Sequence, residues 1–131
     1  MYRHASRRCL LRRTVSLALL ALPSLGCEIF APSGCDAIIV FGLIVRVRSA
    51  QTGAPAGAGA VVTATEGNYV ETLVGFDGLV FQGAQERSGV YTIAVNAPGY
   101  QPWTMQNVEV EDGSCHVKPE TVDASVLPVG N

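Results

Sequence analysis

The feature that most restricts the fold is a series of short segments in which apolar and polar residues alternate. Residues 38–49 are rich in β-branched side chains, and their second half places Leu43, Val45 and Val47 on one face. Residues 90–97 alternate in the same way, with Tyr91, Ile93 and Val95 as the expected core face. A period of two is typical of a strand with one buried face. The sequence therefore predicts strands rather than helices.

Turn signals separate these segments at intervals of about 8–12 residues, the spacing expected of an all-β sandwich. Residues 50–59 read AQTGAPAGAG, and Gly67-Asn68 and residues 76–78 (FDG) also favour turns. We predict an all-β fold of about seven strands, an antiparallel two-sheet sandwich with a Greek-key element. Pro119 predicts an edge or bulge position for the final strand. The remaining strands are expected within residues 60–67, 69–74, 79–82, 103–111 and 115–128, the last with Val122, Ala124 and Val126 on one face.

The first 26 residues have a different character. Five arginines and no acidic residue precede an apolar stretch at residues 14–22, and PSLG then leads into Cys27. This layout is typical of a secretory signal peptide. The apolar stretch is too short for a lasting transmembrane helix, which needs about 20 residues. A buried N-terminal helix is the other alternative, and the arginines argue against it.

The end of this leader resembles the lipobox of bacterial lipoproteins. Gly26 and Cys27 fit that motif, whereas Ser24 and Leu25 depart from its usual order. The resemblance implies that Cys27 carries the lipid, and acyl chains contribute about 0.8 kcal/mol for each buried CH₂ group. We predict a signal peptide at residues 1–26, a tether at 27–36 and one domain at 37–131. The expected location is the bacterial cell envelope, with the domain in the periplasm or at the cell surface.

The export route has two interpretations. SRRCLLR at residues 6–12 is similar to a twin-arginine signal, with Arg7 and Arg8 as the pair. An ordinary secretory signal also begins with basic residues and is at least as good an explanation.

Four cysteines occur in the chain: Cys9, Cys27, Cys35 and Cys115. Cys9 leaves with the leader, and a lipidated Cys27 cannot form a bridge. In an oxidising compartment Cys35 and Cys115 are then expected to form one disulfide. Two buried free thiols are the alternative. A metal site is less favoured, because neither cysteine has a C-x-x-C partner.

The body of the chain is acidic. From Cys27 onward it has four basic and eleven acidic side chains, a formal charge of −7. Nucleic-acid binding needs a basic surface, so a nucleic-acid partner is not expected.

Three segments resemble a carboxypeptidase regulatory-like domain: TGAPAGAGAVVTA (52–64), SGVYTIAVNAPGY (88–100) and VEVEDGSCHVKPETVDASVLP (108–128). This is the transthyretin-like, or prealbumin-like, sandwich, which is also grouped with carbohydrate-binding-like folds. The resemblance covers about residues 37–128. It implies the fold more strongly than an activity, since the module is mostly an appended domain without catalysis.

No catalytic residue, metal site or cofactor is predicted. Glu109, Glu111 and Asp112 form an acidic group for which a solvated strand face is favoured over a calcium site. His116 is interpreted as a surface histidine beside the disulfide. Some transthyretin-like proteins are hydrolases that rely on several histidines, and His116 is the one histidine after the leader.

Three aromatic residues, Tyr69, Tyr100 and Trp103, are the candidate ligand contacts. Exposed rings stack on sugars or anchor protein partners, although Trp103 could instead fill an end of the sandwich. The expected function is that of a non-enzymatic lipoprotein that binds or scaffolds a polysaccharide or an envelope protein. The alternatives are a small secreted or periplasmic hydrolase and a structural accessory subunit of an envelope complex.

Overall fold

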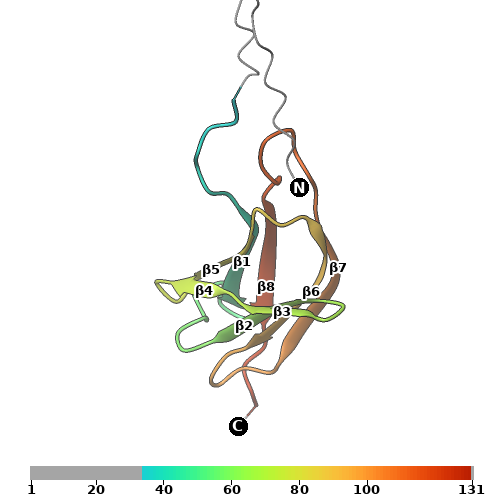
Figure 1. Cartoon of the computed structure of the whole chain (residues 1–131). Coiled ribbons are helices and arrows are strands. Elements are labelled where there is room, and N and C mark those ends of the chain that lie inside the picture. Colours follow the sequence, from blue (N-terminus) through green and yellow to red (C-terminus); the bar gives the residue numbers. More distant parts are fainter. Residues whose placement is uncertain (1–33, 131) are drawn as a thin grey trace, which may run out of the picture. The chain divides into compact units, whose positions relative to one another are not determined.

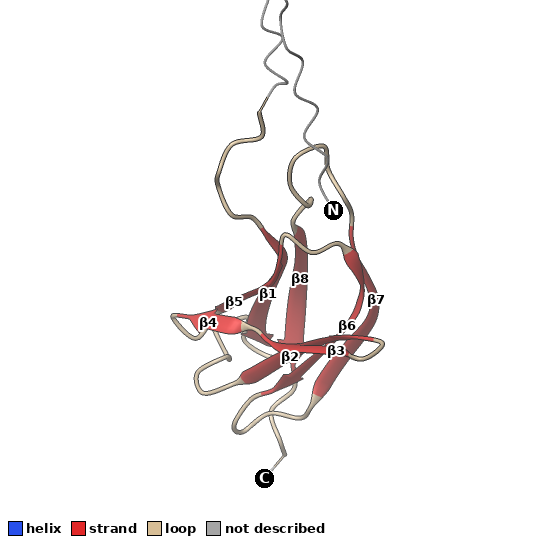
Figure 2. Ribbon diagram, in the orientation of Figure 1, coloured by secondary structure: helices blue, strands red, loops and turns tan. Residues whose placement is uncertain are grey.

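The computed structural model describes residues 34–130, and they form two four-stranded β-sheets packed face to face (Figure 1). No helix occurs within this range (Figure 2). The predicted all-β sandwich is therefore confirmed. The strands are β1 (Phe41–Ser49), β2 (Val61–Glu66), β3 (Tyr69–Thr72), β4 (Val74–Phe76), β5 (Val80–Gln85), β6 (Gly89–Asn96), β7 (Trp103–Val110) and β8 (Glu120–Val126).

The two sheets have the strand orders β4-β5-β1-β8 and β3-β2-β6-β7. All neighbouring strands are antiparallel except β1 and β8, which run parallel with an unbroken register from Leu43–Glu120 to Ser49–Val126. The final strand is thus an edge strand, as Pro119 predicted, and Pro119 itself immediately precedes it.

The structure has eight strands because the segment predicted as one strand at residues 69–74 serves both sheets. β3 pairs with β2, and β4 pairs with β5 of the other sheet. Leu73 lies between them with its side chain buried, and its N–H donates to Val62 O at 2.9 Å. The chain therefore crosses from one sheet to the other at Leu73, whose side chain is buried at that point. That side of the sandwich is closed by continuous backbone.

The core lies between the inner faces of the two sheets. Leu43, Val45 and Val47 on β1 are fully buried, as the alternation predicted. Each such aliphatic side chain contributes about 1.5–3 kcal/mol by leaving water. The other predicted core residues are likewise buried, namely Tyr91, Ile93 and Val95 on β6 and Val122, Ala124 and Val126 on β8.

The opposite side of the sandwich is formed by the edge strands β7 and β8. They are neighbours in space, but no β-ladder joins them. The register of β7 on β6 shifts between Tyr91 and Ile93, and Asn107 on β7 has a positive φ of 59°. Residues 104–107 are exposed on both faces of the strand. We call the groove between these two strands the seam.

A disulfide joins Cys35 to Cys115, with their Cα atoms 5.2 Å apart. The predicted pairing is confirmed, and the alternative of two free thiols is wrong. The bridge attaches the segment before β1 to the loop between β7 and β8, 80 residues away.

The predicted signal peptide, Cys27 and most of the predicted tether lie outside the described residues. Within residues 34–130, no helix is long and apolar enough to cross a membrane.

Candidate functional site

Five polar and aromatic side chains gather at the end of the sandwich where β6 begins: Glu66, Tyr69, Glu71, Arg87 and Tyr91. We call them the arginine cluster. In the β2–β3 hairpin, Glu66 faces Tyr69 and Ala64 faces Glu71. Because Ala64 is buried in the core and strand side chains alternate, Glu66 and Glu71 point to the same inner side. The members on β2, β3 and β6 therefore occupy core-facing positions of the sheet, and Arg87 reaches them from the loop before β6.

Arg87 holds the cluster together. Its Nη1 donates to Tyr91 Oη at 2.6 Å and lies 2.5 Å from Glu66 Oε2. Its guanidinium carbon is 4.0 Å from the centroid of the Tyr69 ring, a cation–π contact. The pKa of Glu66 is lowered, first by the hydrogen bond from the Val90 N–H and then by the Arg87 guanidinium. The carboxylate is thus ionised at neutral pH.

Tyr69 is part of this network and is not a free ligand contact. Its hydroxyl donates to Glu71 Oε2 at 2.7 Å, and the Ala84 N–H donates to the same oxygen at 2.8 Å. Burial, followed by the hydrogen bond to Glu71, raises the pKa of Tyr69 to about 12. The phenol therefore stays neutral. Because no buried side-chain polar atom of the described chain lacks a partner, the arrangement is that of a structural network.

His116 lies between two carboxylates, which the sequence did not suggest. Its Nδ1 is 2.8 Å from Glu86 Oε1, and its Nε2 is 2.6 Å from Asp36 Oδ1. Glu86 Oε1 also accepts the Val40 N–H at 2.7 Å. The pKa of His116 is raised, chiefly by the hydrogen bond to Asp36 and then by that to Glu86. Both ring nitrogens are engaged with acceptors, so neither is left to take a proton from a nucleophile.

This arrangement predicts a pH-dependent stability. Because the pKa of His116 is higher in the folded chain than its ordinary 6.5, its contribution is fully present below about pH 6.5 and is lost as the pH rises through the folded value. The pKa of Glu86 is lowered, first by the Val40 N–H, so its contribution is lost as the pH falls below about 4.5. We expect the urea concentration at the unfolding midpoint to decrease as the pH rises from about 6 to about 9.

The matched control is His116→Gln, which has no charge at any pH in this range. Its urea midpoint should be nearly constant over the same interval, while the wild-type midpoint declines. An equal decline in both proteins would contradict the assignment to His116.

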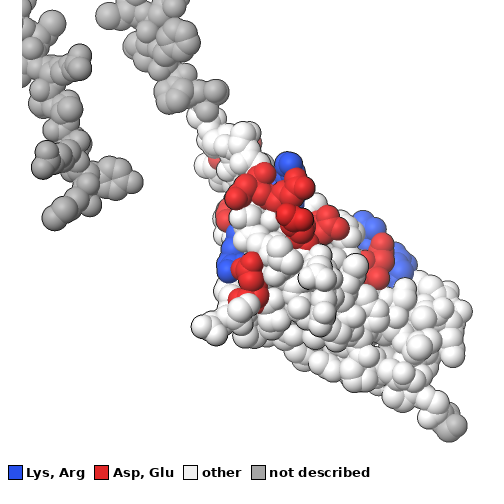
Figure 3. Space-filling view, turned by 90° about the vertical axis from the view of Figure 1, so that its right-hand side faces the viewer, with Lys and Arg blue, Asp and Glu red and all other residues white. Residues whose placement is uncertain are grey.

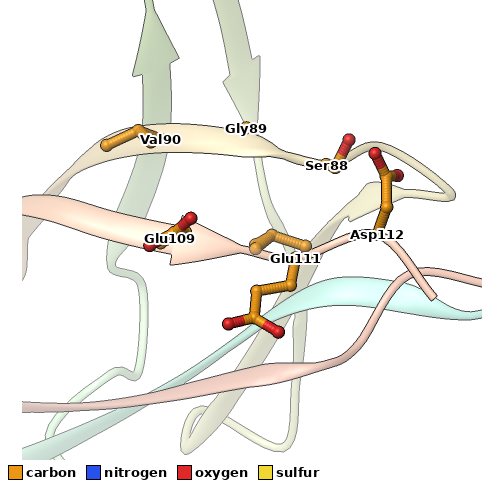
Figure 4. Close-up of a pocket in the computed structure, with 7 residues that line it drawn as sticks. Ser88, Gly89, Val90, Glu109, Glu111 and Asp112 are labelled. Atoms are coloured by element: carbon orange, nitrogen blue, oxygen red, sulfur yellow. The ribbon is translucent and has the colours of Figure 1, made fainter.

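The acidic residues near the end of β7 line one side of a cavity of about 300 Å³. Figure 4 shows Glu109, Glu111 and Asp112 along one wall and Ser88, Gly89 and Val90 along the other, with the three carboxylates pointing in different directions. Residues 34–130 contain no group of three or more acidic, histidine or cysteine side chains placed to hold a metal ion. Glu111 instead pairs with Lys118 at 2.5 Å.

The two other predicted aromatic contacts belong to the β6–β7 loop and the start of β7, and these segments lie at the end of the domain opposite the segment before β1 (Figure 1). Tyr100 forms a β-bridge with Pro128, and Trp103 begins β7. Both rings are half-buried against the core. Their loop, residues 97–102, is fixed to the C-terminal segment 127–130, whose Leu127 and Val129 are 51% and 52% exposed. We call these two segments together with Trp103 the tip.

The structure therefore separates the three candidate aromatics. Tyr100 and Trp103 share the tip, whereas Tyr69 belongs to the arginine cluster. The sequence missed the partners of His116 and Arg87, because most of those partners lie on other strands or loops. The one local signal was the alternation that places Glu66 on the core face.

No protein-family model matches the chain, and no curated protein matches it.

Proposed function

We propose that this protein is an exported lipoprotein, anchored to a bacterial membrane through Cys27, whose β-sandwich binds a polysaccharide or an envelope protein without catalysis. The proposal includes the likeness to carboxypeptidase regulatory-like domains and their transthyretin-like Greek-key arrangement. The anchor rests on the leader and on the lipobox-like residues before Cys27.

The disulfide is the observation that carries the proposal. Disulfides persist in exported proteins and are rare in reducing compartments. Cys35 and Cys115 are joined, which leaves Cys9 in the leader and Cys27 at its end. That distribution agrees with a chain cut before Cys27, lipidated there and folded outside the cytoplasm.

The placement of the tip supports a binding role. The described chain enters the domain at the end that carries the disulfide, and the tip lies at the opposite end (Figure 1). Cys27 is eight residues before Cys35, so an anchor there would be joined to the domain at the end opposite the tip. The half-buried rings of Tyr100 and Trp103 beside exposed Leu127 offer apolar contact for a sugar face or a protein.

The hydrolase alternative is less well supported, because His116 is engaged by Asp36 and Glu86 on both sides. A structural accessory subunit and a glycan binder differ in the kind of molecule that they bind. The subunit would be recovered with a fixed protein partner, and the glycan binder would be retained by defined sugars.

One experiment tests both parts of the proposal. The full chain is expressed in a bacterium that processes lipoproteins and is purified from solubilised membranes. Mass spectrometry should find diacylglycerol on an N-terminal Cys27, and Cys27→Ser should abolish the modification. An unmodified N-terminus at another residue would refute the anchor.

The same preparation is used to detect the ligand by glycan array and by protein co-purification. Tyr100→Ala should reduce retention about tenfold or more, as truncation of an aromatic anchor does. Val70→Ala is the matched control, since Val70 is 67% exposed on β3, away from the tip. Equal retention by Tyr100→Ala and Val70→Ala would place the ligand elsewhere.

A further inference from the structure

The seam has the form of a docking groove for an extended chain. β7 and β8 are each the last strand of their sheet, so each has one edge whose N–H and C=O groups are not used in a ladder. A cavity of about 390 Å³ lies between them, lined by residues of both strands.

The two edges differ in their ability to accept another strand. β8 is a regular strand of seven residues whose register on β1 is continuous. β7 is interrupted by the register shift opposite β6 and by the positive φ of Asn107. A bulge of this kind re-aims an edge and hinders pairing. The free edge of β8 is therefore the one suited to strand addition.

The charge on the seam selects the class of occupant. Glu109, Glu111, Glu120 and Asp123 line it, and no basic residue does. Figure 3 shows acidic side chains gathered over one part of the β7 side of the domain while most of that face is uncharged. Ion pairs within residues 34–130 engage Glu111 with Lys118 and, at 4.0 Å, Asp123 with Arg46. Glu109 and Glu120 form none within that range.

These carboxylates are spread along the groove and do not converge on a point where a metal ion could bind. The rest of the lining is mixed, with Asn107 and Thr121 beside three apolar residues. Val108 and Val122 are buried there, and the Met105 side chain is 46% exposed. Alternating cationic and apolar side chains fit such a surface, because successive residues of a strand point to opposite faces.

A second copy of this chain is a poor occupant, since it would bring like-charged carboxylates together across two edges. Nucleic acids and anionic lipid headgroups are repelled for the same reason. We propose that the seam binds an extended, lysine- or arginine-rich segment of a partner protein, which adds as a strand to the free edge of β8. This site requires neither the anchor at Cys27 nor the tip.

The probe is the peptide acetyl-Lys-Val-Lys-Val-Lys-Val-Lys-amide, which matches β8 in length, added to the exported protein in non-ionic detergent. Binding is measured by calorimetry, and hydrogen–deuterium exchange is followed by mass spectrometry. The peptide should bind, and exchange of amides in residues 120–126 should slow. Two comparison peptides separate charge from backbone pairing. One replaces every lysine by glutamate, and the other replaces the central valine by proline, which keeps the charge but removes one N–H.

The variant Glu109→Gln/Glu120→Gln should weaken binding about five- to tenfold, the loss expected for two exposed charge pairs. Asp77→Asn is the control. It also removes a negative charge, but in the β4–β5 turn, where asparagine tolerates the φ of 52° and keeps an oxygen for the Leu79 N–H. Its affinity should match the wild type.

The proposal is overturned if the lysine peptide does not bind, if the proline peptide binds equally well, or if the Gln variant binds like Asp77→Asn. Unchanged exchange in residues 120–126 despite binding would also reject strand addition. None of these outcomes bears on acylation of Cys27 or on ligand retention by the tip, so this inference and the proposed function fail separately.

Discussion

Replacing both Cys35 and Cys115 by serine should lower the free energy of unfolding by about 4–5 kcal/mol. The bridge closes a loop with a sequence separation of 80, and the chain-entropy model assigns that loss to the freedom regained by the unfolded chain. A domain of this size has a net stability on the order of 5–15 kcal/mol. The effect is therefore a large fraction of the total, and part of the population could unfold at 37 °C.

Urea unfolding followed by circular dichroism measures this difference. Dithiothreitol should destabilise the wild type to a similar extent and leave the double serine variant unchanged, which separates reduction from other effects of the reagent. A loss below about 1 kcal/mol would mean that the unfolded chain is already restricted without the bridge.

Tyr91→Ala should destabilise the domain by about 3–5 kcal/mol, the range for truncating a large buried aromatic side chain. Tyr91 is the largest of the fully buried side chains in residues 34–130. Its ring also lies 6.2 Å from the Tyr69 ring in an edge-on arrangement. Removing the ring leaves a cavity and removes the contacts that Tyr91 makes with Tyr69 and Arg87 in the arginine cluster.

Tyr91→Phe separates packing from hydrogen bonding. It keeps the ring and removes the hydroxyl that accepts from Arg87 Nη1 at 2.6 Å and donates to Arg87 O at 3.0 Å. We expect a loss of about 1–3 kcal/mol, because both Arg87 groups lose a partner. Thermal and urea unfolding of the two variants measure the difference. If Tyr91→Phe lost as much stability as Tyr91→Ala, the hydroxyl rather than the ring would account for most of the contribution of Tyr91.

Much of the sandwich could be predicted from local alternation. Leu43, Val45 and Val47 were assigned to the core from their spacing alone, and all three are fully buried. This works because each strand has one face in the core, so the sequence repeats the geometry of the sheet. The pairing of Cys35 with Cys115 was also predictable, because so few cysteines remained to be paired.

The rest depended on contacts between distant segments. In the sequence Leu73 resembles any other apolar residue of a strand. It is a crossing point because the residues before it pair with β2 and the residues after it pair with β5 of the other sheet. His116 was interpreted as a surface residue because no partner for it was evident by motif, and Asp36 lies 80 positions away in the sequence. The seam is likewise invisible in the sequence, since β7 and β8 are separated by a loop that gives no indication of which edges meet.

The parallel pairing of β1 with β8 has a consequence for the order of folding. The first strand of the domain lies between β5 and the last strand, so its second edge stays unpaired until residues 120–126 are available. The sheet that contains β1 therefore cannot be completed until residues 120–126 have joined it. Contacts of such large sequence separation fold slowly. Until β8 is in place, the second edge of β1 is open to pairing with a strand of another chain.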